Sequence, residues 1–379
     1  MVGSFHVMAK QNGTKRVRYA VVGLGYFAQT AVLPAFKRAR NSELVALVSG
    51  DPTKLELLKK RYRVPVAVHY DEYERLLRSG DIDAAYLVLP NSEHADFTLR
   101  TANAGVHVLC EKPMATTEDE CWGMIAACEG AGVRLMIAYR LHFERTNLEA
   151  IELVKRGRIG EPRLFDSVFA LQVRANNSRT SEELGGGPLN DIGIYCVNAA
   201  RYVFRSEPTE VMALSGKRDD DERFSEIDEH VGALLRFPGD RIATFVASFG
   251  ASEVSCFEIV GTKGSLRLDP AYSHSEALRY ELSASGKPKI RRTFRKRDQV
   301  APEIGYFSEC ILERRTPEPS GLEGLADVRI LRAIEESASR GERVTLRPLV
   351  KSERPNLSLE DHAPPHGRPR LIRADEPSI

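Results

Sequence analysis

Residues 23–28 read Gly-Leu-Gly-Tyr-Phe-Ala and have the spacing of a dinucleotide-binding turn. Gly23 allows a tight turn after a strand, Gly25 lets the backbone approach a pyrophosphate, and Ala28 leaves room for close packing of the next helix. Free N–H groups at the N-terminus of that helix then face the phosphates. The alternative is a glycine turn without a ligand. Here, however, the turn follows an apolar run and begins a strand–helix series, which is the context that a nucleotide site requires.

The end of the second predicted strand indicates which nicotinamide cofactor binds. NAD sites usually carry an acidic residue there, which binds the ribose 2′-hydroxyl, whereas this chain has Ser49-Gly50. Ser49 can donate to a phosphate and Lys54 lies one turn into the next helix, so the sequence favours the 2′-phosphate of NADP. In the competing interpretation Asp51 binds the ribose and the cofactor is NAD, although Asp51 is better explained as the cap of the helix that Pro52 opens.

Residues 17–139 alternate strand and helix patterns, which place the glycine turn at the edge of a parallel sheet. The predicted strands are residues 17–22, 43–48, 66–69, 83–89, 106–110 and 134–138. A capping box at Thr117 begins one of the intervening helices, and Gly130 and Gly132 end it. The repeated pattern predicts an α/β fold with an N-terminal, doubly wound Rossmann sheet.

From about residue 140 the pattern becomes that of an α+β domain with an open, mostly antiparallel sheet. Strands are predicted at residues 163–173, 210–215, 231–237, 242–249, 256–261 and 265–268, and helices at 147–156, 190–204 and 325–339. We therefore predict a dinucleotide-binding domain over residues 17–139 and a substrate and oligomerisation domain over 140–346. Residues 1–16 and 347–379 are predicted to be disordered, since the second of these ends combines six prolines with many charges.

The composition excludes several other classes of protein. The 379 residues carry a net charge of +1 and no apolar run of membrane-spanning length, so we expect neither nucleic acid nor a membrane as partner. The basic run 287–297 is interpreted as a solvated strand or loop. The cysteines and histidines lack metal-ligand spacing, so we predict no metal site. The six cysteines fall in apolar segments, which suits a reducing, cytoplasmic compartment.

Two further segments contain residues that can do chemistry. Residues 110–116 read Cys-Glu-Lys-Pro-Met-Ala-Thr directly after the fifth predicted strand, and residues 191–195 read Asp-Ile-Gly-Ile-Tyr in the second domain. At these positions and at the glycine turn the chain resembles the glucose–fructose oxidoreductase / inositol dehydrogenase / rhizopine catabolism (Gfo/Idh/MocA) family. The resemblance runs from about residue 18 to residue 346, and within the family the chain looks most like glucose–fructose oxidoreductase.

The resemblance implies that Lys112 and Asp191 hold the substrate and that Tyr195 transfers the proton. Elementary chemistry supports these roles, because oxidation of an alcohol sends a hydride to nicotinamide and a proton to a base. A free tyrosine, with a pKa of about 10, is a poor base, but a nearby lysine cation favours phenolate. Asp191 and Tyr195 are four residues apart, so on a helix they share one face. In isolation each residue has a plainer explanation as a loop lysine, a helix cap or a core tyrosine.

The resemblance also implies contacts with the cofactor from residues after the fourth, fifth and sixth strands. His94 is as well explained by packing, and Arg140 almost as well by a structural salt bridge. The residues that we predict to bind the cofactor are Gly23, Gly25, Tyr26, Phe27, Ser49, Lys54, Pro90, Asn91, His94, Glu111, Lys112 and Arg140. We expect a dissociable cofactor and, because relatives often pair through the open sheet, a homodimer or homotetramer.

Together these observations predict an NADP(H)-dependent oxidoreductase that moves a hydride between nicotinamide and a CH–OH or C=O carbon of a sugar or polyol. Tyr26 stands where glucose–fructose oxidoreductase has a lysine, and the segment 174–184 is shorter than its counterpart, so the sequence leaves the sugar open. Two alternatives stay open at this point. One is a non-catalytic, NADP-sensing regulator on the same fold, and the other is an NAD-dependent, redox-assisted glycosidase.

Overall fold

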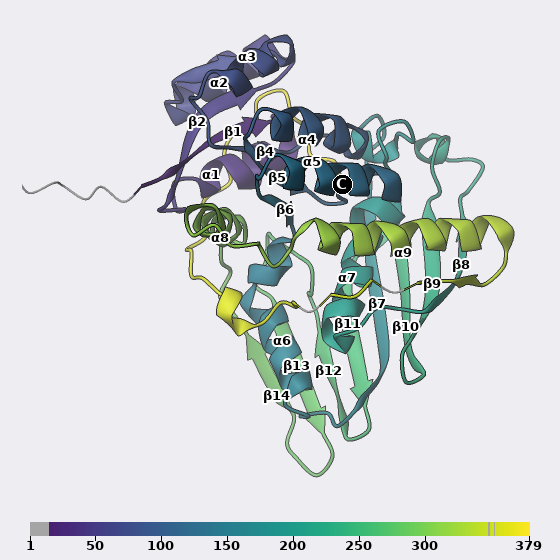
Figure 1. Ribbon diagram of the computed structural model, residues 1–379. Coiled ribbons are helices and arrows are strands. Elements are labelled where there is room, and N and C mark those ends of the chain that lie inside the picture. Colours follow the sequence, from purple (N-terminus) through teal and green to yellow (C-terminus); the bar gives the residue numbers. More distant parts are fainter. Residues whose placement is uncertain (1–14, 348, 352) are drawn as a thin grey trace, which may run out of the picture.

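A computed structural model of the chain describes residues 15–347, 349–351 and 353–379 (Figure 1). The N-terminal domain contains a parallel sheet with the strand order β3-β2-β1-β4-β5-β6. Its strands are β1 (Val17–Val22), β2 (Ser42–Val48), β3 (Val66–Val68), β4 (Ala84–Leu87), β5 (His107–Glu111) and β6 (Leu135–Ala138). This order is that of a doubly wound dinucleotide-binding sheet. The predicted Rossmann fold is therefore confirmed.

Helices connect these strands and cover both faces of the sheet. They are the π-helical turn η1 (Ala28–Val32) with α1 (Leu33–Ala35), α2 (Pro52–Tyr62), α3 (Tyr73–Arg78), α4 (His94–Asn103) and α5 (Glu118–Gly130). Asp51 caps α2 by accepting the N–H groups of Thr53 and Lys54. Thr117 and Glu120 form the predicted capping box of α5. Strand β4 is buried on both faces, as its apolar run requires.

The second domain contains one mixed sheet, ordered β14-β13-β12-β11-β7-β10-β9-β8-β15. Neighbouring strands are antiparallel except for the pair β7–β10. The strands are β7 (Pro162–Gln172), β8 (Glu210–Gly216), β9 (His230–Phe237), β10 (Arg241–Ser248), β11 (Gly250–Gly261), β12 (Gly264–Leu268), β13 (Arg279–Ala284), β14 (Ile290–Thr293) and β15 (Val344–Thr345). Helices α6 (Arg145–Lys155), α7 (Ile194–Phe204) and α9 (Gly321–Arg340) pack on one face of this sheet.

The basic run 287–297 forms the exposed edge of this sheet. Its centre is β14, whose four residues are all exposed. Lys289 and Arg291 both pair with Glu281 on the neighbouring strand β13. The interpretation of this run as a solvated strand is confirmed.

Helix α8 (Val300–Leu312) lies within the segment 140–346 that is predicted to form the second domain. It follows the second sheet in the chain but packs on the Rossmann domain, where Ile304 and Phe307 are fully buried. The hydroxyl groups of Tyr19 on β1 and Ser308 on α8 lie 2.8 Å apart. The N-terminal core is thus completed by residues far along the sequence. The sequence does not show that α8 packs on the first domain, because only tertiary contacts reveal this packing.

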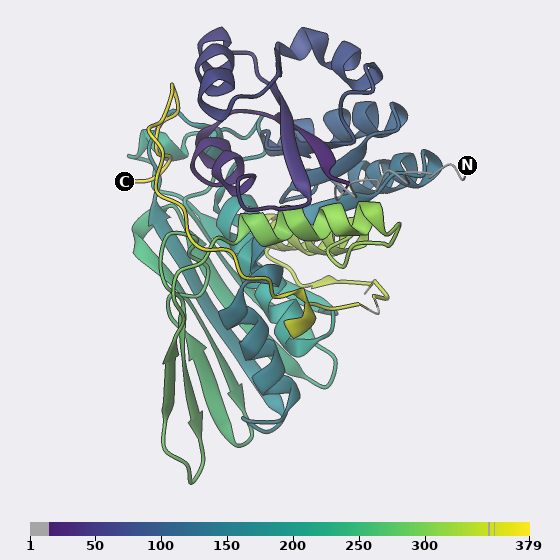
Figure 2. The same cartoon turned by 90° about the vertical axis from the view of Figure 1, so that its left-hand side faces the viewer.

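The C-terminal residues differ from the predicted disordered end. Lys351 lies 3.1 Å from Glu318 and also pairs with Glu323, and Arg354 lies 2.6 Å from Glu207. The chain then follows the junction of the two domains and continues along the Rossmann domain (Figure 2). Buried ion pairs therefore hold a segment whose proline and charge content indicates disorder. The prediction for residues 1–14 lies outside the described residues.

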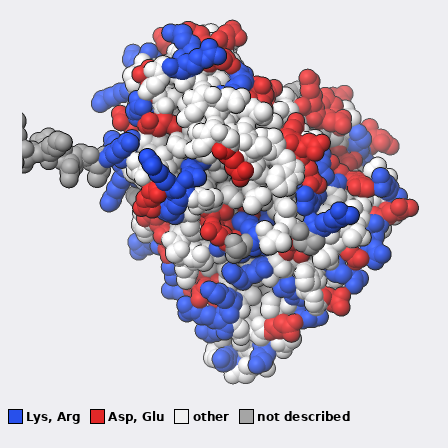
Figure 3. All heavy atoms as spheres, in the orientation of Figure 1, with Lys and Arg blue, Asp and Glu red and all other residues white. Residues whose placement is uncertain are grey.

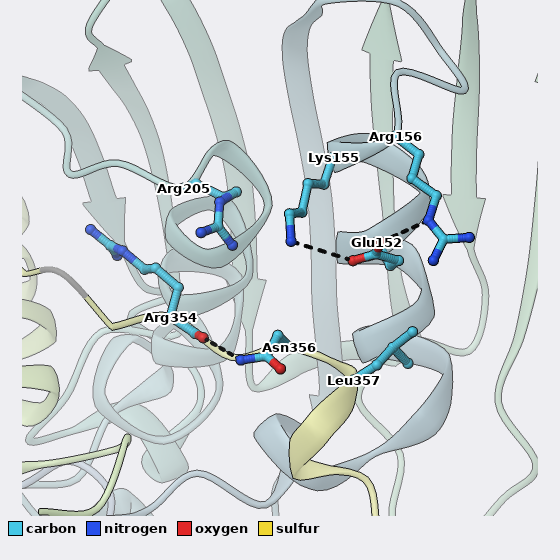
Figure 4. A pocket seen from close by; sticks show the side chains of 7 residues that line it. All are labelled: Glu152, Lys155, Arg156, Arg205, Arg354, Asn356 and Leu357. Atoms are coloured by element: carbon cyan, nitrogen blue, oxygen red, sulfur yellow. Dashed lines mark hydrogen bonds and ion pairs between the residues drawn. The ribbon is translucent and has the colours of Figure 1, made fainter.

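A hollow of about 280 Å³ lies where this segment passes helix α6 (Figure 4). Its lining is mainly basic and consists of Glu152, Lys155, Arg156, Arg205, Arg354, Asn356 and Leu357. Arg156 and Lys155 pair with Glu152 across one turn of α6, at 2.7 and 3.8 Å. Basic residues at the end of a helix complement its dipole. We therefore ascribe this charge to the ends of α6 and α7 and not to a ligand site.

The surface carries charges of both signs. On the face shown in Figure 3, acidic and basic side chains are interspersed over both domains. In the part of the chain that the structure describes, no helix combines the length and the apolar character that crossing a bilayer would require.

Candidate active site

The glycine turn follows β1 and has the shape that a dinucleotide needs. Gly23 has a φ of +92°, and a Cβ atom there would lie 2.2 Å from the carbonyl oxygen of Val88. A side chain at this position is therefore excluded by both conformation and space. At Gly25, in contrast, no atom lies within 4 Å of the position of a Cβ. The open space beside Gly25 lets a pyrophosphate approach the backbone, so these residues fit a dinucleotide.

The end of β2 has the features predicted for an NADP site. Ser49 is buried, and its Oγ accepts the N–H of Asp51 at 3.2 Å. Asp51 is engaged as the cap of α2, as expected, and Lys54 lies in the first turn of that helix. A helix N-terminus with a hydroxyl and a lysine beside it suits a phosphate group.

Lys112, Asp191 and Tyr195 meet at the junction of the two domains. Lys112 follows β5, while Asp191 lies in the π-helical turn η6 (Leu189–Gly193) that leads into α7, where Tyr195 lies. Lys112 Nζ donates to the carbonyl oxygen of Asp191 at 2.8 Å and to its Oδ1 at 3.2 Å. The same ammonium group lies 4.9 Å from the centre of the Tyr195 ring. The structure therefore brings together three residues that are up to 83 positions apart (195 − 112).

A second cation, Arg179, completes the environment of Asp191. Its Nε lies 3.0 Å from Asp191 Oδ2, and it comes from the 3-10 turn η5 (Ser178–Thr180). Burial raises the pKa of the Asp191 carboxyl, but Arg179 and Lys112 outweigh burial and hold it below its usual value. Burial lowers the pKa of Lys112, while Tyr195 and Asp191 more than compensate and raise it. The pair is therefore ionised and poised to bind polar groups.

Arg179 was missed in the sequence because nothing distinguishes it from a solvated loop arginine. The sequence offered one signal in this region: the segment 174–184 is shorter than its counterpart in glucose–fructose oxidoreductase. Arg140 was expected at this site and is present. Its guanidinium lies 4.9 Å from the centre of the Tyr195 ring, donates to Tyr272 O at 2.6 Å and also bonds Gln299. Two cations thus face the ring of the tyrosine.

Glu111 takes part in a buried acidic group next to Lys112. Its Oε1 accepts the hydroxyl of Tyr86 at 2.8 Å, and the same hydroxyl lies 3.3 Å from Glu303 on α8. Burial and the charge of Glu111 raise the pKa of Glu303 well above its usual value. In the structure Glu111 therefore bonds within the Rossmann core. Its predicted contact with the cofactor ribose stays a prediction.

The remaining predicted cofactor ligands take different positions. Asn91 follows Pro90 and donates to Gly185 O at 2.7 Å, so it joins the two domains. Both ring nitrogens of His94 face backbone oxygens, at 2.8 Å for Pro113 and 3.1 Å for Leu89. This histidine therefore holds two loops together.

Phe27 and Tyr26 lie at the mouth of the site. The Phe27 ring makes an edge contact with His274, with ring centres 6.0 Å apart, and the Tyr26 hydroxyl donates to Glu376 at 3.1 Å. His274 was not predicted at this place. Residues from two distant parts of the chain, His274 and Glu376, thus contact the glycine turn.

Comparisons with known proteins agree with this architecture. Residues 17–139 match the oxidoreductase family with an NAD-binding Rossmann fold, and residues 147–267 match the GFO/IDH/MocA C-terminal domain. D-xylose 1-dehydrogenase [NADP(+)] of Haloarcula marismortui is 31% identical over 87% of this chain and 93% of its own length. D-xylose 1-dehydrogenase (NADP(+)) 2 of Haloferax volcanii is 30% identical over 86% of this chain and 99% of its own length.

A solved structure shows the same fold over both domains. The aldose–aldose oxidoreductase from Caulobacter crescentus, complexed with glycerol, superposes with a TM-score of 0.84 and 37% identity. The match covers 88% of this chain and all of that one. With the glycine turn, the two sheets and the Lys112–Asp191–Tyr195 set, these matches show that the chain belongs to the Gfo/Idh/MocA oxidoreductase family.

Proposed function

We propose that this chain is an NADP(H)-dependent oxidoreductase that transfers a hydride between nicotinamide and a CH–OH or C=O carbon of a sugar or polyol. The observation that carries the proposal is the contact of Lys112 with both Asp191 and the ring of Tyr195. The D-xylose dehydrogenases and the aldose–aldose oxidoreductase to which the chain is similar act on sugars, as their names state. An aldose is therefore the first substrate to test.

The residues would share the reaction as follows. NADP, when bound along the glycine turn and the end of β2, supplies the hydride acceptor, and NADPH supplies the donor. Asp191 accepts hydrogen bonds from substrate hydroxyls and Lys112 donates to substrate oxygen. Tyr195 takes the proton of the reacting hydroxyl in oxidation and returns it in reduction. The nearby ammonium of Lys112 and guanidinium of Arg140 would stabilise the tyrosinate that takes this proton in oxidation and that is left when the proton is given in reduction.

The test is cofactor turnover across a panel of aldoses, ketoses, inositols and anhydro-sugars, followed by the absorbance of the reduced nicotinamide. We expect turnover of at least one sugar with NADP, at a rate above that with NAD, and its loss in Lys112→Ala. Binding of NADP without turnover of any sugar would support the regulator instead. Turnover of a glycoside with no net change in absorbance would support the redox-assisted glycosidase.

We further infer that two or four copies associate through the outer face of the second sheet. The face opposite the helices carries a group of apolar side chains that are 38–71% exposed: Leu164, Met212, Leu214, Leu234, Val246 and Val260. Several of them are paired neighbours in the ladder, such as Met212 with Leu234 and Leu164 with Val260. Contiguous exposed apolar patches mark interaction surfaces, and symmetric pairing is the commonest way to cover one.

The oligomer is tested by light scattering after gel filtration. Leu234→Arg places a charge at the centre of this face, and Leu322→Arg on helix α9, where Leu322 is 38% exposed, is a matched control away from it. We expect the first variant to dissociate and the second to keep the mass of the wild type. Equal masses for both variants would exclude this face.

We also place the protein in the cytoplasm. All six cysteines are unpaired and buried, which suits a reducing compartment. A fractionation of cells expressing the native gene, with the protein detected by antibody, tests this placement.

A further inference from the structure

Residues 365–379, called the strap below, pass along the Rossmann domain beside the glycine turn (Figure 2). The backbone of Ile372 is held by Gln29, whose Nε2 donates to Ile372 O and whose Oε1 accepts its N–H, each at 2.9 Å. Gln29 is fully buried and lies on the helical turn that follows the glycines. The hydroxyl of Tyr26, within the turn itself, donates to Glu376 at 3.1 Å. The strap is therefore fixed both to the glycine turn and to the helical turn that follows it.

The end of the strap is fixed to the second domain. Ser378 forms a β-bridge with Val173, just beyond the end of β7. Arg174 N donates to Pro377 O at 2.9 Å, and Ile379 N donates to Gln172 O at 2.8 Å. Between Ile372 and Pro377 the strap thus crosses from one domain to the other.

Arg373 extends from the strap to the end of β2. Its Nη1 lies 3.4 Å from Asp51 Oδ1, beside the buried Ser49. Its side chain is 63% exposed, so it has donors left for a ligand. Its φ of +45° lies in the left-handed region, which non-glycine residues adopt infrequently and often at functional sites. A guanidinium presents a planar set of donors that matches a phosphate. This is the place where an NADP site needs such a group.

The strap leaves Gly25 open to a ligand. It contacts Tyr26, Gln29 and Asp51 on either side of the turn, while no atom lies within 4 Å of the position of a Gly25 Cβ. Gly25 is exposed, so a ligand lying along the turn to Ser49 would pass between the contacts that the strap makes at Tyr26 and at Asp51. Because the strap is held at Ile372 and again beyond Pro377, opening one of these attachments would widen the path by which a ligand exchanges.

We propose that the strap closes over bound NADP, slows its exchange, and supplies Arg373 to the 2′-phosphate. This inference rests on the proposed NADP dependence and replaces the expectation of a freely dissociable cofactor. A strap that merely ties the two domains together would affect stability without distinguishing NADP from NAD.

The test uses the full-length protein and three variants. One is truncated after Arg370, the second is Arg373→Ala, and the third is Arg370→Ala, a matched control whose side chain is an exposed arginine of the same strap. NADPH fluorescence gives the affinity, and a chase of bound NADPH with excess NADP gives the release rate. NADH gives the affinity for a cofactor without the 2′-phosphate. Thermal unfolding without cofactor shows whether each variant is folded.

We expect truncation to speed the release of NADPH by at least about tenfold. Arg373→Ala should lower the affinity for NADPH by about tenfold, the effect of one charge-assisted contact, and should change the affinity for NADH little. Arg370→Ala should match the wild type in both measurements. Release at the wild-type rate from a folded truncated chain, or an equal loss for NADPH and NADH in Arg373→Ala, would overturn the proposal. Wild-type protein that binds neither cofactor would instead refute the proposed function. If truncation prevents folding, the affinities of Arg373→Ala for NADPH and NADH alone test the proposal.

Discussion

Lys112 Nζ lies 2.8 Å from the main-chain oxygen of Asp191 and 3.2 Å from its carboxylate, so one ammonium group joins the two domains at the proposed reaction site. The lysine follows a strand of the Rossmann sheet, and the aspartate begins a helix of the second domain. Both side chains are largely buried, which strengthens their attraction. Any motion that separates the domains must break this contact. Separation of the domains would therefore remove Lys112 from Asp191.

Lys112→Ala is expected to lower kcat by roughly a hundred- to ten-thousand-fold, the usual contribution of a positioned proton-transfer system. Asp191 keeps Arg179 as a partner in this variant, so the fold should persist. Steady-state kinetics with NADP and the best sugar measure the effect, and NADPH fluorescence shows whether cofactor still binds. Lys287→Ala, at an exposed position outside the site, is the control. A kcat within about threefold of the wild type would remove Lys112 from the mechanism.

Tyr195→Phe should abolish proton transfer while it keeps the aromatic ring that contacts Lys112 and Arg140. We expect kcat to fall by at least about a hundredfold with little change in NADPH affinity. Tyr272→Phe is a matched control, since its ring centre lies 5.9 Å from that of Tyr195 while its hydroxyl bonds Ser167. Equal losses in the two variants would indicate a packing effect and contradict the assignment.

The sequence was sufficient for the parts of the fold that depend on local pattern. Parallel strands buried on both faces are short apolar runs, and glycine turns and caps mark their ends, so the Rossmann strands were predicted within one or two residues. Strand β13 and helix α8 were not predicted, and β14 lies in a run that was predicted only as a solvated strand or loop. Strand β14 is wholly exposed and has no apolar alternation. Helix α8 takes its place through contacts with elements such as β1, β2 and α1, which lie in the first fifty residues of the chain.

The site was predictable to the same extent. Lys112, Asp191 and Tyr195 lie in motifs, whereas Arg179 and Arg373 lie in irregular segments whose partners only the folded chain defines. The C-terminal segment shows the reason most clearly. Its prolines and charges indicate disorder, but Lys351 and Arg354 find buried carboxylates that compensate for the cost of ordering them. The composition of a segment gives the number of its charged residues but does not show which residues they pair with in the fold.

Arg179→Ala should change the pH dependence of the reaction. Arg179 helps to hold the pKa of Asp191 below its usual value against the effect of burial, so its removal raises that pKa. Asp191 must be ionised to bind substrate, and we therefore expect the acidic limb of kcat/KM to move to higher pH. Arg179→Lys, which keeps the charge, should restore most of the profile. A loss of the same factor at every pH would show that Arg179 acts only through the position of its loop.

Two glycine variants separate fold from cofactor binding. Gly23→Ala meets Val88 O at 2.2 Å with a φ of +92°, so we expect a loss of at least about 2 kcal/mol in the free energy of unfolding. Gly25→Ala meets no atom within 4 Å and should be as stable as the wild type in urea. The added methyl group, however, occupies the space proposed for the pyrophosphate, so NADPH affinity should fall by about tenfold or more. Unchanged affinity in Gly25→Ala would place the cofactor elsewhere.

Because of His94, we expect the stability of the fold to decrease in acid. It is fully buried, and burial lowers its pKa from 6.5 to about 4. Since the unfolded chain binds this proton first, stability is fully present above about pH 6.5 and is lost as the pH falls to about 4, by on the order of 3 kcal/mol. His94→Gln should be less stable at neutral pH but lose less stability over this window. Urea unfolding at several pH values measures the slope, and His362→Gln, at an exposed position, should leave it unchanged. Parallel slopes for wild type and His94→Gln would show that the acid sensitivity arises from other groups.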